Sequence, residues 1–141
     1  MERWMIYAIL SMVFAGITAV LAKFGMKDVN SDTALLVRTF VVLVFVAFNA
    51  FLFKNATTEL KQISLSSFAL LSLSALATTF SWVFYYRAMK EGPISYVASI
   101  DKASIVITLL LSFLLFKEPV TPKVLLGAGL ILGGMLVLVW K

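Results

Sequence analysis

The chain has 141 residues, of which 62% are hydrophobic and only 13% charged, and its mean hydropathy is +1.02. Soluble domains are about 45–50% apolar with about a quarter of their residues charged, so most of this chain is predicted to lie in a membrane. The net charge of +5 comes from cations that fall singly between apolar runs. Because the sequence holds no basic block and no aromatic-interleaved basic patch, we expect no nucleic-acid partner.

The sequence also limits the chemistry that the protein performs. It contains no cysteine and no histidine, which excludes disulfides, thiolate and imidazole metal ligands, and Ser-His catalysis. No pair of acidic residues falls at one depth of the predicted membrane spans. We therefore expect no metal, no cofactor and no enzymatic activity.

Five apolar segments are long enough to cross a bilayer as helices. A hydrocarbon core about 30 Å thick needs about 20 mostly apolar helical residues, and we divide the chain where charges and turn residues cluster. The segments cover residues 4–22, 33–53, 63–86, 94–116 and 124–140. Gly92-Pro93 separates the third segment from the fourth, and proline is favoured there because it can begin a helix. The sequence thus predicts an all-α, multi-pass membrane protein with a single domain over residues 1–141.

Positive charges do not favour one orientation of the chain. Cytoplasmic loops normally carry an excess of Lys and Arg, but here the two sides of the membrane receive equal numbers. The side of the N-terminus has Arg3, Lys54, Lys61, Lys117 and Lys123, and the other side has Lys23, Lys27, Arg87, Lys90 and Lys141. This balance predicts insertion in both orientations, unless misplaced span boundaries hide a real bias. Because the number of spans is odd, two copies in opposite orientations form an inverted repeat, on which many secondary transporters are built.

Three ionisable side chains inside the spans are the strongest candidates for a functional site, because a charge within a bilayer needs a partner or water. They are Arg38, Asp101 and Lys102. At about 1.5 Å per residue, Arg38 lies about 7–8 Å below the face that bears Lys23, and the other two lie about 10–12 Å below it. We expect Arg38 to pair with Asp101 and to leave Lys102 without a carboxylate. The surplus positive charge suits an anionic or zwitterionic solute.

Asp101 is also our candidate for carrying a coupling proton, since burial favours the neutral form of a carboxyl group.

Other polar and aromatic residues are weaker candidates. The weaker candidates for lining a solute cavity are Lys23, Ser99, Trp82 and Tyr86. Structural roles are the alternative, because the aromatic rings also fit an interfacial belt. In the same way, an Arg38–Asp101 pair would lock the fold while Lys102 extends to the surface.

The C-terminal part of the sequence resembles a known transporter unit. Residues 84–141 read FYYRAMKEGPISYVASIDKASIVITLLLSFLLFKEPVTPKVLLGAGLILGGMLVLVWK. This stretch holds an aromatic-rich third span, a Gly-Pro turn, a fourth span of small residues, a connection with Glu118, and a Gly-rich last span. Ala22-Lys23 and Arg38-Thr39 also fit the pattern. On these features the chain resembles, over essentially its whole length, one EamA-type half of a drug/metabolite transporter.

The resemblance implies one inverted-repeat unit of a ten-helix fold in the cytoplasmic membrane. Most members of that superfamily carry two such units in one chain and move metabolites or drugs. For this chain it implies an antiparallel homodimer that moves a small metabolite or drug-like solute by alternating access, along a path between the protomers. Gly129 and Gly133 in the last span have the spacing that lets helices approach closely.

Two other functions remain open on the sequence alone. One is a non-transporting membrane scaffold or assembly protein, whose buried charges only fix the register of its helices. The other is a cation exporter like the small multidrug resistance proteins. Those proteins have four spans and a functional Glu in the first, whereas the first span here contains no acid.

Overall fold

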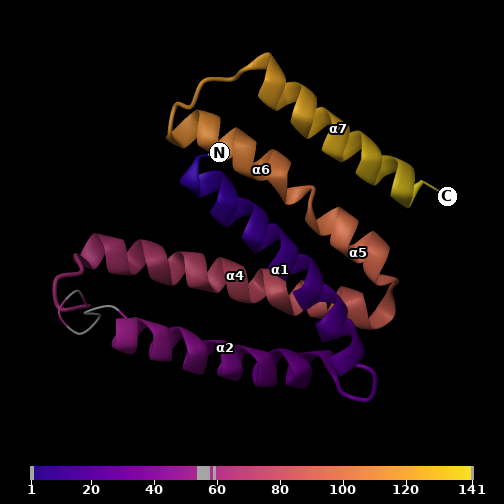
Figure 1. Cartoon of the computed structure of the whole chain (residues 1–141). Helices are drawn as coiled ribbons and strands as arrows, with labels where there is room; N and C mark the ends of the chain where they lie inside the picture. Colours follow the sequence, from indigo (N-terminus) through magenta and orange to yellow (C-terminus); the bar gives the residue numbers. More distant parts are fainter. Residues whose placement is uncertain (1, 54–57, 59, 141) are drawn as a thin grey trace. The chain divides into compact units, whose positions relative to one another are not determined.

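The computed structural model describes residues 2–53, 58 and 60–140, and these residues form helices and connections without a β-strand (Figure 1). The helices are α1 (Arg3–Gly25), α2 (Ser31–Phe53), α4 (Leu65–Glu91), α5 (Ile94–Asp101), α6 (Ser104–Leu115) and α7 (Pro122–Val139). Lys54 and Lys141, which the charge balance includes, lie outside the described residues.

The described chain has five helical spans that are long and apolar enough to cross a membrane, so the predicted all-α, five-span fold is confirmed. The spans are Arg3–Gly25, Ser31–Leu52, Leu65–Glu91, Ile94–Leu115 and Pro122–Val139. The largest difference from the predicted boundaries is at the end of the third span. Arg87 and Lys90, which we assigned to a connection, lie in the last turns of α4.

A short polar side chain lies at the start of three of the helices. Each of these side chains accepts a hydrogen bond from a backbone amide that has no partner within the helix. The Asn30 oxygen accepts from an amide of α2 at 2.9 Å, the Ser64 hydroxyl from one of α4 at 3.1 Å, and the Thr121 hydroxyl from one of α7 at 3.3 Å. Helix α5 begins directly after Pro93, as predicted from the Gly-Pro turn.

The fourth span, Ile94–Leu115, contains a short turn that the sequence did not predict. Helix α5 ends at Asp101, and α6 begins at Ser104. Lys102 and Ala103 between them have φ/ψ angles of −69°/−14° and −64°/−15°, and their amides bond to carbonyls three residues back at 3.2 and 3.0 Å. This is a 3₁₀-type turn, a tighter form that is often found at a hinge within a helix.

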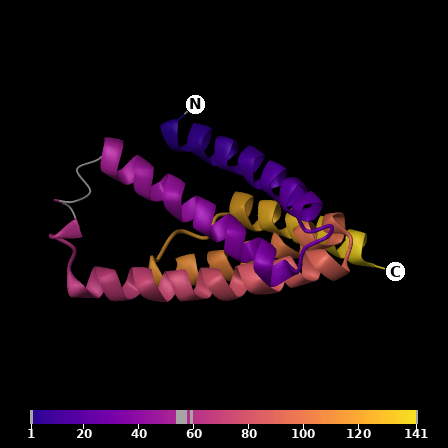
Figure 2. The ribbon, with the colours of Figure 1, turned by 90° about the horizontal axis from the view of Figure 1, so that it is seen from below.

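The chain divides into two compact units, residues 1–90 and residues 91–141. In the first unit, α2 and α4 converge at the end that bears the α1–α2 turn (Figure 2). Met26, at the C-terminal end of α1, and Met89, near the end of α4, are 1% and 0% exposed. The small buried core of this unit is therefore at that end of the helices.

In the second unit, α5 contacts α7. The connection from α6 to α7 is held by Ser112, whose hydroxyl donates to a carboxylate oxygen of Glu118 at 2.8 Å. No described atom of the chain other than the helix's own backbone and adjacent residues lies within 4 Å of a Cβ added at Gly129 or Gly133. Their surface on α7 is therefore open within the described part of the second unit.

Candidate functional site

The first unit brings three of the predicted site residues together. The guanidinium carbon of Arg38, on α2, lies 4.4 Å from the centre of the Trp82 ring and 6.0 Å from that of the Tyr86 ring. Trp82 and Tyr86 are four residues apart on α4, so they project from the same face of that helix. A cation at such distances is attracted to the electron-rich face of an aromatic ring. Each of these three residues was predicted as a site residue, but their contact with one another was not.

Two polar atoms of this cluster lack hydrogen bonds. Arg38 Nη1 and Tyr86 Oη are buried, and neither has a hydrogen-bond partner among the residues that the structure describes. Tyr86 is only 4% exposed. A buried donor without a partner costs about 1–3 kcal/mol, and more when it is charged. The cluster is thus incomplete as it stands and has donors available for a further group.

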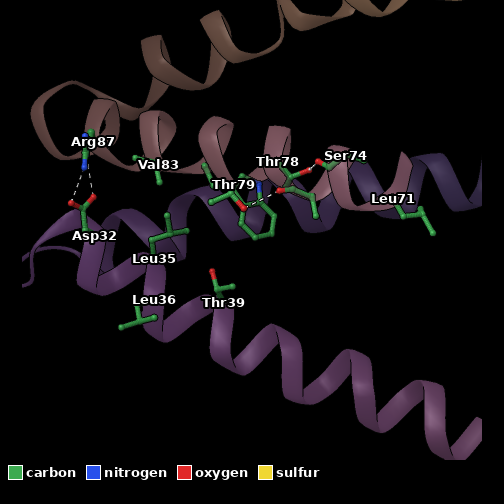
Figure 3. A pocket seen from close by; sticks show the side chains of 12 residues that line it. Asp32, Leu35, Leu36, Thr39, Leu71, Ser74, Thr78, Thr79, Val83 and Arg87 are labelled. Carbon is green, nitrogen blue, oxygen red and sulfur yellow. Dashed lines mark hydrogen bonds and ion pairs between the residues drawn. The ribbon is translucent and has the colours of Figure 1, made fainter. Parts of the chain in front are cut away.

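Residues of this cluster line two cavities. A cavity of about 420 Å³ is lined by Arg38 and Tyr86 together with small and apolar residues of α1, α2 and the α1–α2 turn. A larger cavity of about 680 Å³ lies between α2 and α4 and is lined by Trp82 (Figure 3). Its wall also carries the hydroxyl groups of Thr39 and Ser74. The hydroxyls of Thr78 and Thr79 in the same wall donate to carbonyls of α4 at 2.9 Å.

An ion pair closes one end of the larger cavity. Arg87 Nε and Nη2 donate to the two carboxylate oxygens of Asp32 at 3.1 and 3.0 Å, and Figure 3 shows the two side chains facing each other between α2 and α4. Each side chain is about half exposed. Asp32 was not among the predicted site residues. It lies in the first turn of α2, where an acidic residue is favoured, and that position could have identified it.

Two lysines bind the C-terminal ends of neighbouring helices. Lys23, at the end of α1, donates to the carbonyl of Met89 in α4. In return, Lys90 of α4 donates to the carbonyls of Met26, Lys27 and Val29 at 2.5, 3.2 and 3.0 Å. A cation is favoured there because the last carbonyls of a helix have no partner within it. Lys23, a predicted cavity residue, is not among the residues that line the two cavities above.

The remaining candidates lie in the second unit. Lys102 Nζ lies 3.2 Å from Asp101 Oδ2, so the expectation that Lys102 has no carboxylate partner is wrong. Ser99 donates to the carbonyl of Ser95 at 2.7 Å, which uses its hydroxyl proton within α5. Arg38 belongs to the other compact unit, and its pairing with Asp101 stays a prediction.

The chemistry of the first-unit cluster suits hydrogen bonding to an anion. The described residues contain no group of three or more Asp or Glu side chains placed to hold a metal ion. Arg38 has only donors, and the Tyr86 hydroxyl donates as well as accepts. The geometry therefore favours a ligand that brings its own acceptor oxygens.

The five spans define a multi-pass membrane protein, and polar groups lie between the helices of its first unit. Residues 2–140 match the model of the EamA-like transporter family, and the chain belongs to that family. It is also 38% identical over 140 residues to an uncharacterized transporter in the cobO 3′ region of Sinorhizobium sp., covering 97% of this chain and 96% of the relative. No solved structure matches it. These findings support a membrane transporter, and the predicted resemblance to an EamA-type unit is confirmed.

Proposed function

We propose that two copies of this chain, inserted in opposite orientations, form a ten-helix carrier in the cytoplasmic membrane. The carrier moves a small metabolite or drug-like solute by exposing a central site alternately to the two sides. Inverted repeats are a common basis for this mechanism, because the two halves exchange conformations as rigid parts around one site. The family and the relative's name support transport as such, and the proposal adds the assembly and the mechanism.

The observation that carries the proposal is that Arg38 Nη1, in the wall of a cavity within the spans, has no hydrogen-bond partner among the described residues. Charged groups are rare within membrane helices and mostly face a bundle interior or water, where they mark substrate or ion pathways. A scaffold would gain nothing from a buried guanidinium nitrogen without a hydrogen bond. A carrier gains from it, because the solute completes the hydrogen bonds when it binds.

The proposed second copy is supported by surfaces that the single chain leaves open. Gly129 and Gly133 have the spacing of closely packed membrane helices, and no described atom outside their own helix and neighbours lies near them. Five spans and a balanced set of positive charges favour an oppositely oriented copy as the occupant.

Reporter fusions test the orientation. Matched reporters, one active outside the membrane and one inside, are fused in turn to each terminus and expressed in cells. We expect comparable signals from both sides of the membrane for the same terminus. A signal from one side alone contradicts the antiparallel arrangement.

Cysteine cross-linking tests the contact between copies. Because the natural chain contains no cysteine, a single Gly129→Cys substitution reports on that position alone. We expect an oxidised dimer in membranes from Gly129→Cys. The matched control is Leu130→Cys, which is one residue further around α7 and 77% exposed, and we expect less dimer from it. Equal yields from the two variants contradict packing through the glycine surface.

Flux through reconstituted protein tests the function itself. Proteoliposomes are loaded with labelled leucine, malate or tetraphenylphosphonium as a zwitterion, an anion and a cation, and release is compared with that from protein-free vesicles. Labelled isocaproate is included as a second anion that carries one carboxylate. We expect saturable release of an anion or of the zwitterion. Release of the cation alone would point to a cation exporter instead. The Arg38→Ala, Asp101→Ala double variant separates a carrier, which keeps its dimer and loses flux, from a scaffold, which loses the dimer.

A further inference from the structure

The smaller cavity of the first unit is lined mostly by apolar residues and by a few polar ones. Its volume of about 420 Å³ is near the lower end of the range of about 300–1,000 Å³ that is typical of small-molecule sites. Most of its wall is apolar and comes from residues such as Leu21, Val29 and Val37. The polar side chains of the wall are Thr18, Arg38 and Tyr86. A ligand that fits this wall has a polar head and an apolar body.

The charge in this wall has one sign. Arg38 is the only charged residue among the described residues that line the cavity, and no Asp or Glu is among them. An ammonium group in this cavity would lose water without gaining a carboxylate among the described lining residues, which is unfavourable. A carboxylate would instead meet the guanidinium. The wall thus selects against a cation and gives a zwitterion no partner for its positive end.

The stack on Trp82 determines which part of the Arg38 guanidinium is available to bind a ligand. An aromatic ring contacts the flat face of a guanidinium, as the 4.4 Å distance to the Trp82 ring centre indicates. The five N–H donors lie in the plane of the group, so stacking leaves them available. Nη1 is one of these donors and has no hydrogen-bond partner in the described chain. The ring therefore occupies a face of the guanidinium, and a carboxylate that binds Arg38 does so through the N–H groups at its edge.

Tyr86 supplies a second donor to the same place. Its hydroxyl is buried without a partner, its ring centre lies 6.0 Å from the guanidinium carbon, and it lines the same cavity as Arg38. Two residues on neighbouring helices thus line one cavity, and each has a buried polar atom without a hydrogen-bond partner in the described chain. A carboxylate satisfies both, because each of its oxygens accepts more than one hydrogen bond.

We propose that this cavity binds a small monocarboxylate with a short aliphatic body. Arg38 holds the carboxylate, Tyr86 donates a further hydrogen bond to it, and the apolar wall of α1 and α2 surrounds the body. This inference rests on the proposed transport function, since it names the class of solute that the carrier takes. It narrows the anionic or zwitterionic solute expected from the sequence to a monoanion.

Binding to the purified full-length protein in detergent tests this inference with ligands of one carbon skeleton. The probes are isocaproate, its neutral amide isocaproamide, isohexylamine and leucine, with affinities measured by calorimetry. We expect isocaproate to bind at least about tenfold more tightly than each of the other three, which corresponds to about 1.4 kcal/mol. Equal or tighter binding of isohexylamine or leucine overturns the proposal. So does an absence of isocaproate binding.

A lipid is the other source of the same head group. Palmitate carries a carboxylate on a chain of membrane-lipid length and is tested as a competitor. We expect isocaproate to bind without being displaced preferentially by palmitate. Tighter binding of palmitate than of isocaproate assigns the cavity to a membrane lipid and overturns the metabolite part of the inference.

Variants assign the binding to the named atoms. Arg38→Gln removes the charge and is expected to weaken isocaproate binding by about tenfold to a hundredfold, and Tyr86→Phe removes one hydroxyl and is expected to weaken it severalfold. Arg38→Lys keeps the charge but loses the planar fork, so an intermediate loss is expected. The matched control is Tyr7→Phe on α1, where Tyr7 is 70% exposed and no loss is expected.

These outcomes separate this inference from the proposed function. If Arg38→Gln fails to fold, the Tyr86→Phe and Tyr7→Phe pair still decides the assignment. Equal affinities of Tyr86→Phe, Arg38→Lys and the natural protein for isocaproate overturn the site. Saturable flux of another solute in proteoliposomes, together with no isocaproate binding, refutes the carboxylate site and leaves the carrier proposal intact. Isocaproate binding without flux of any solute refutes the carrier proposal and leaves the carboxylate site intact.

Discussion

Replacement of Lys90 tests whether the lysine contacts at the helix ends stabilise the first unit. The Lys90 ammonium has three N–H donors, and it binds the three carbonyls of Met26, Lys27 and Val29 at 2.5, 3.2 and 3.0 Å. These contacts join the last turn of α4 to the end of α1 and the turn that follows it. Lys90→Met keeps a long unbranched side chain and removes all three donors.

The expected loss of stability follows from the exposure of these contacts. One contact is partly buried and two are exposed. Hydrogen bonds contribute about 0.5–1.5 kcal/mol each after exchange with water, so the two exposed ones are assigned the lower value and the buried one about 1 kcal/mol. We therefore expect Lys90→Met to lower the free energy of unfolding by about 2 kcal/mol.

Denaturant unfolding of the purified protein in mixed micelles, followed by tryptophan fluorescence, measures this change. The matched control is Lys27→Met, since Lys27 is an exposed lysine in the adjoining turn and the same substitution there is expected to change the free energy of unfolding by less than about 0.5 kcal/mol. Lys90→Arg keeps a cation with several donors and is expected to fall between the two. A Lys90→Met variant as stable as Lys27→Met refutes this account of the helix ends.

Three further results are expected. Trp82→Leu removes the ring that holds Arg38 and is expected to lower the free energy of unfolding by about 1–2 kcal/mol beyond the loss in Trp82→Phe, which keeps a ring, as measured by the same unfolding experiment; equal losses would argue against the cation–π contact. Asp101→Asn is expected to abolish proton-driven flux in proteoliposomes with an imposed pH gradient, and unchanged flux would remove Asp101 from the mechanism. Asp32→Asn breaks the exposed ion pair with Arg87 and is expected to lower the melting temperature at low ionic strength but much less at about 1 M salt, where exposed charges are screened; a salt-independent effect would indicate a role other than charge pairing.

The five spans were predictable because hydropathy over about 20 residues is a strong signal in a chain without soluble domains. The Gly92-Pro93 break was also predictable, because proline restricts the residue before it and cannot continue a helix. Arg38 stood out for the same reason as the spans, since a guanidinium within an apolar segment needs a partner. Composition along the chain therefore predicts where helices cross the membrane and which charges are exceptional.

Contacts between helices were not predictable in the same way. Arg87 and Lys90 were assigned to a connection because charges usually end a span, but Asp32 and the carbonyls of the α1–α2 turn stabilise them within α4. The break in the fourth span has neither glycine nor proline at Lys102 and Ala103, so no local signal marks it. Such features depend on partners that are distant in sequence or on small changes of backbone geometry.

The stack of Arg38 on Trp82 links the walls of the two cavities in the first unit. Arg38 lines the smaller cavity and Trp82 the larger one, so the stacked pair contributes one side chain to each wall. Separating a guanidinium from a ring costs about 2 kcal/mol or less. A ligand that moves Arg38 in the smaller cavity therefore also changes what packs against a ring in the wall of the larger one.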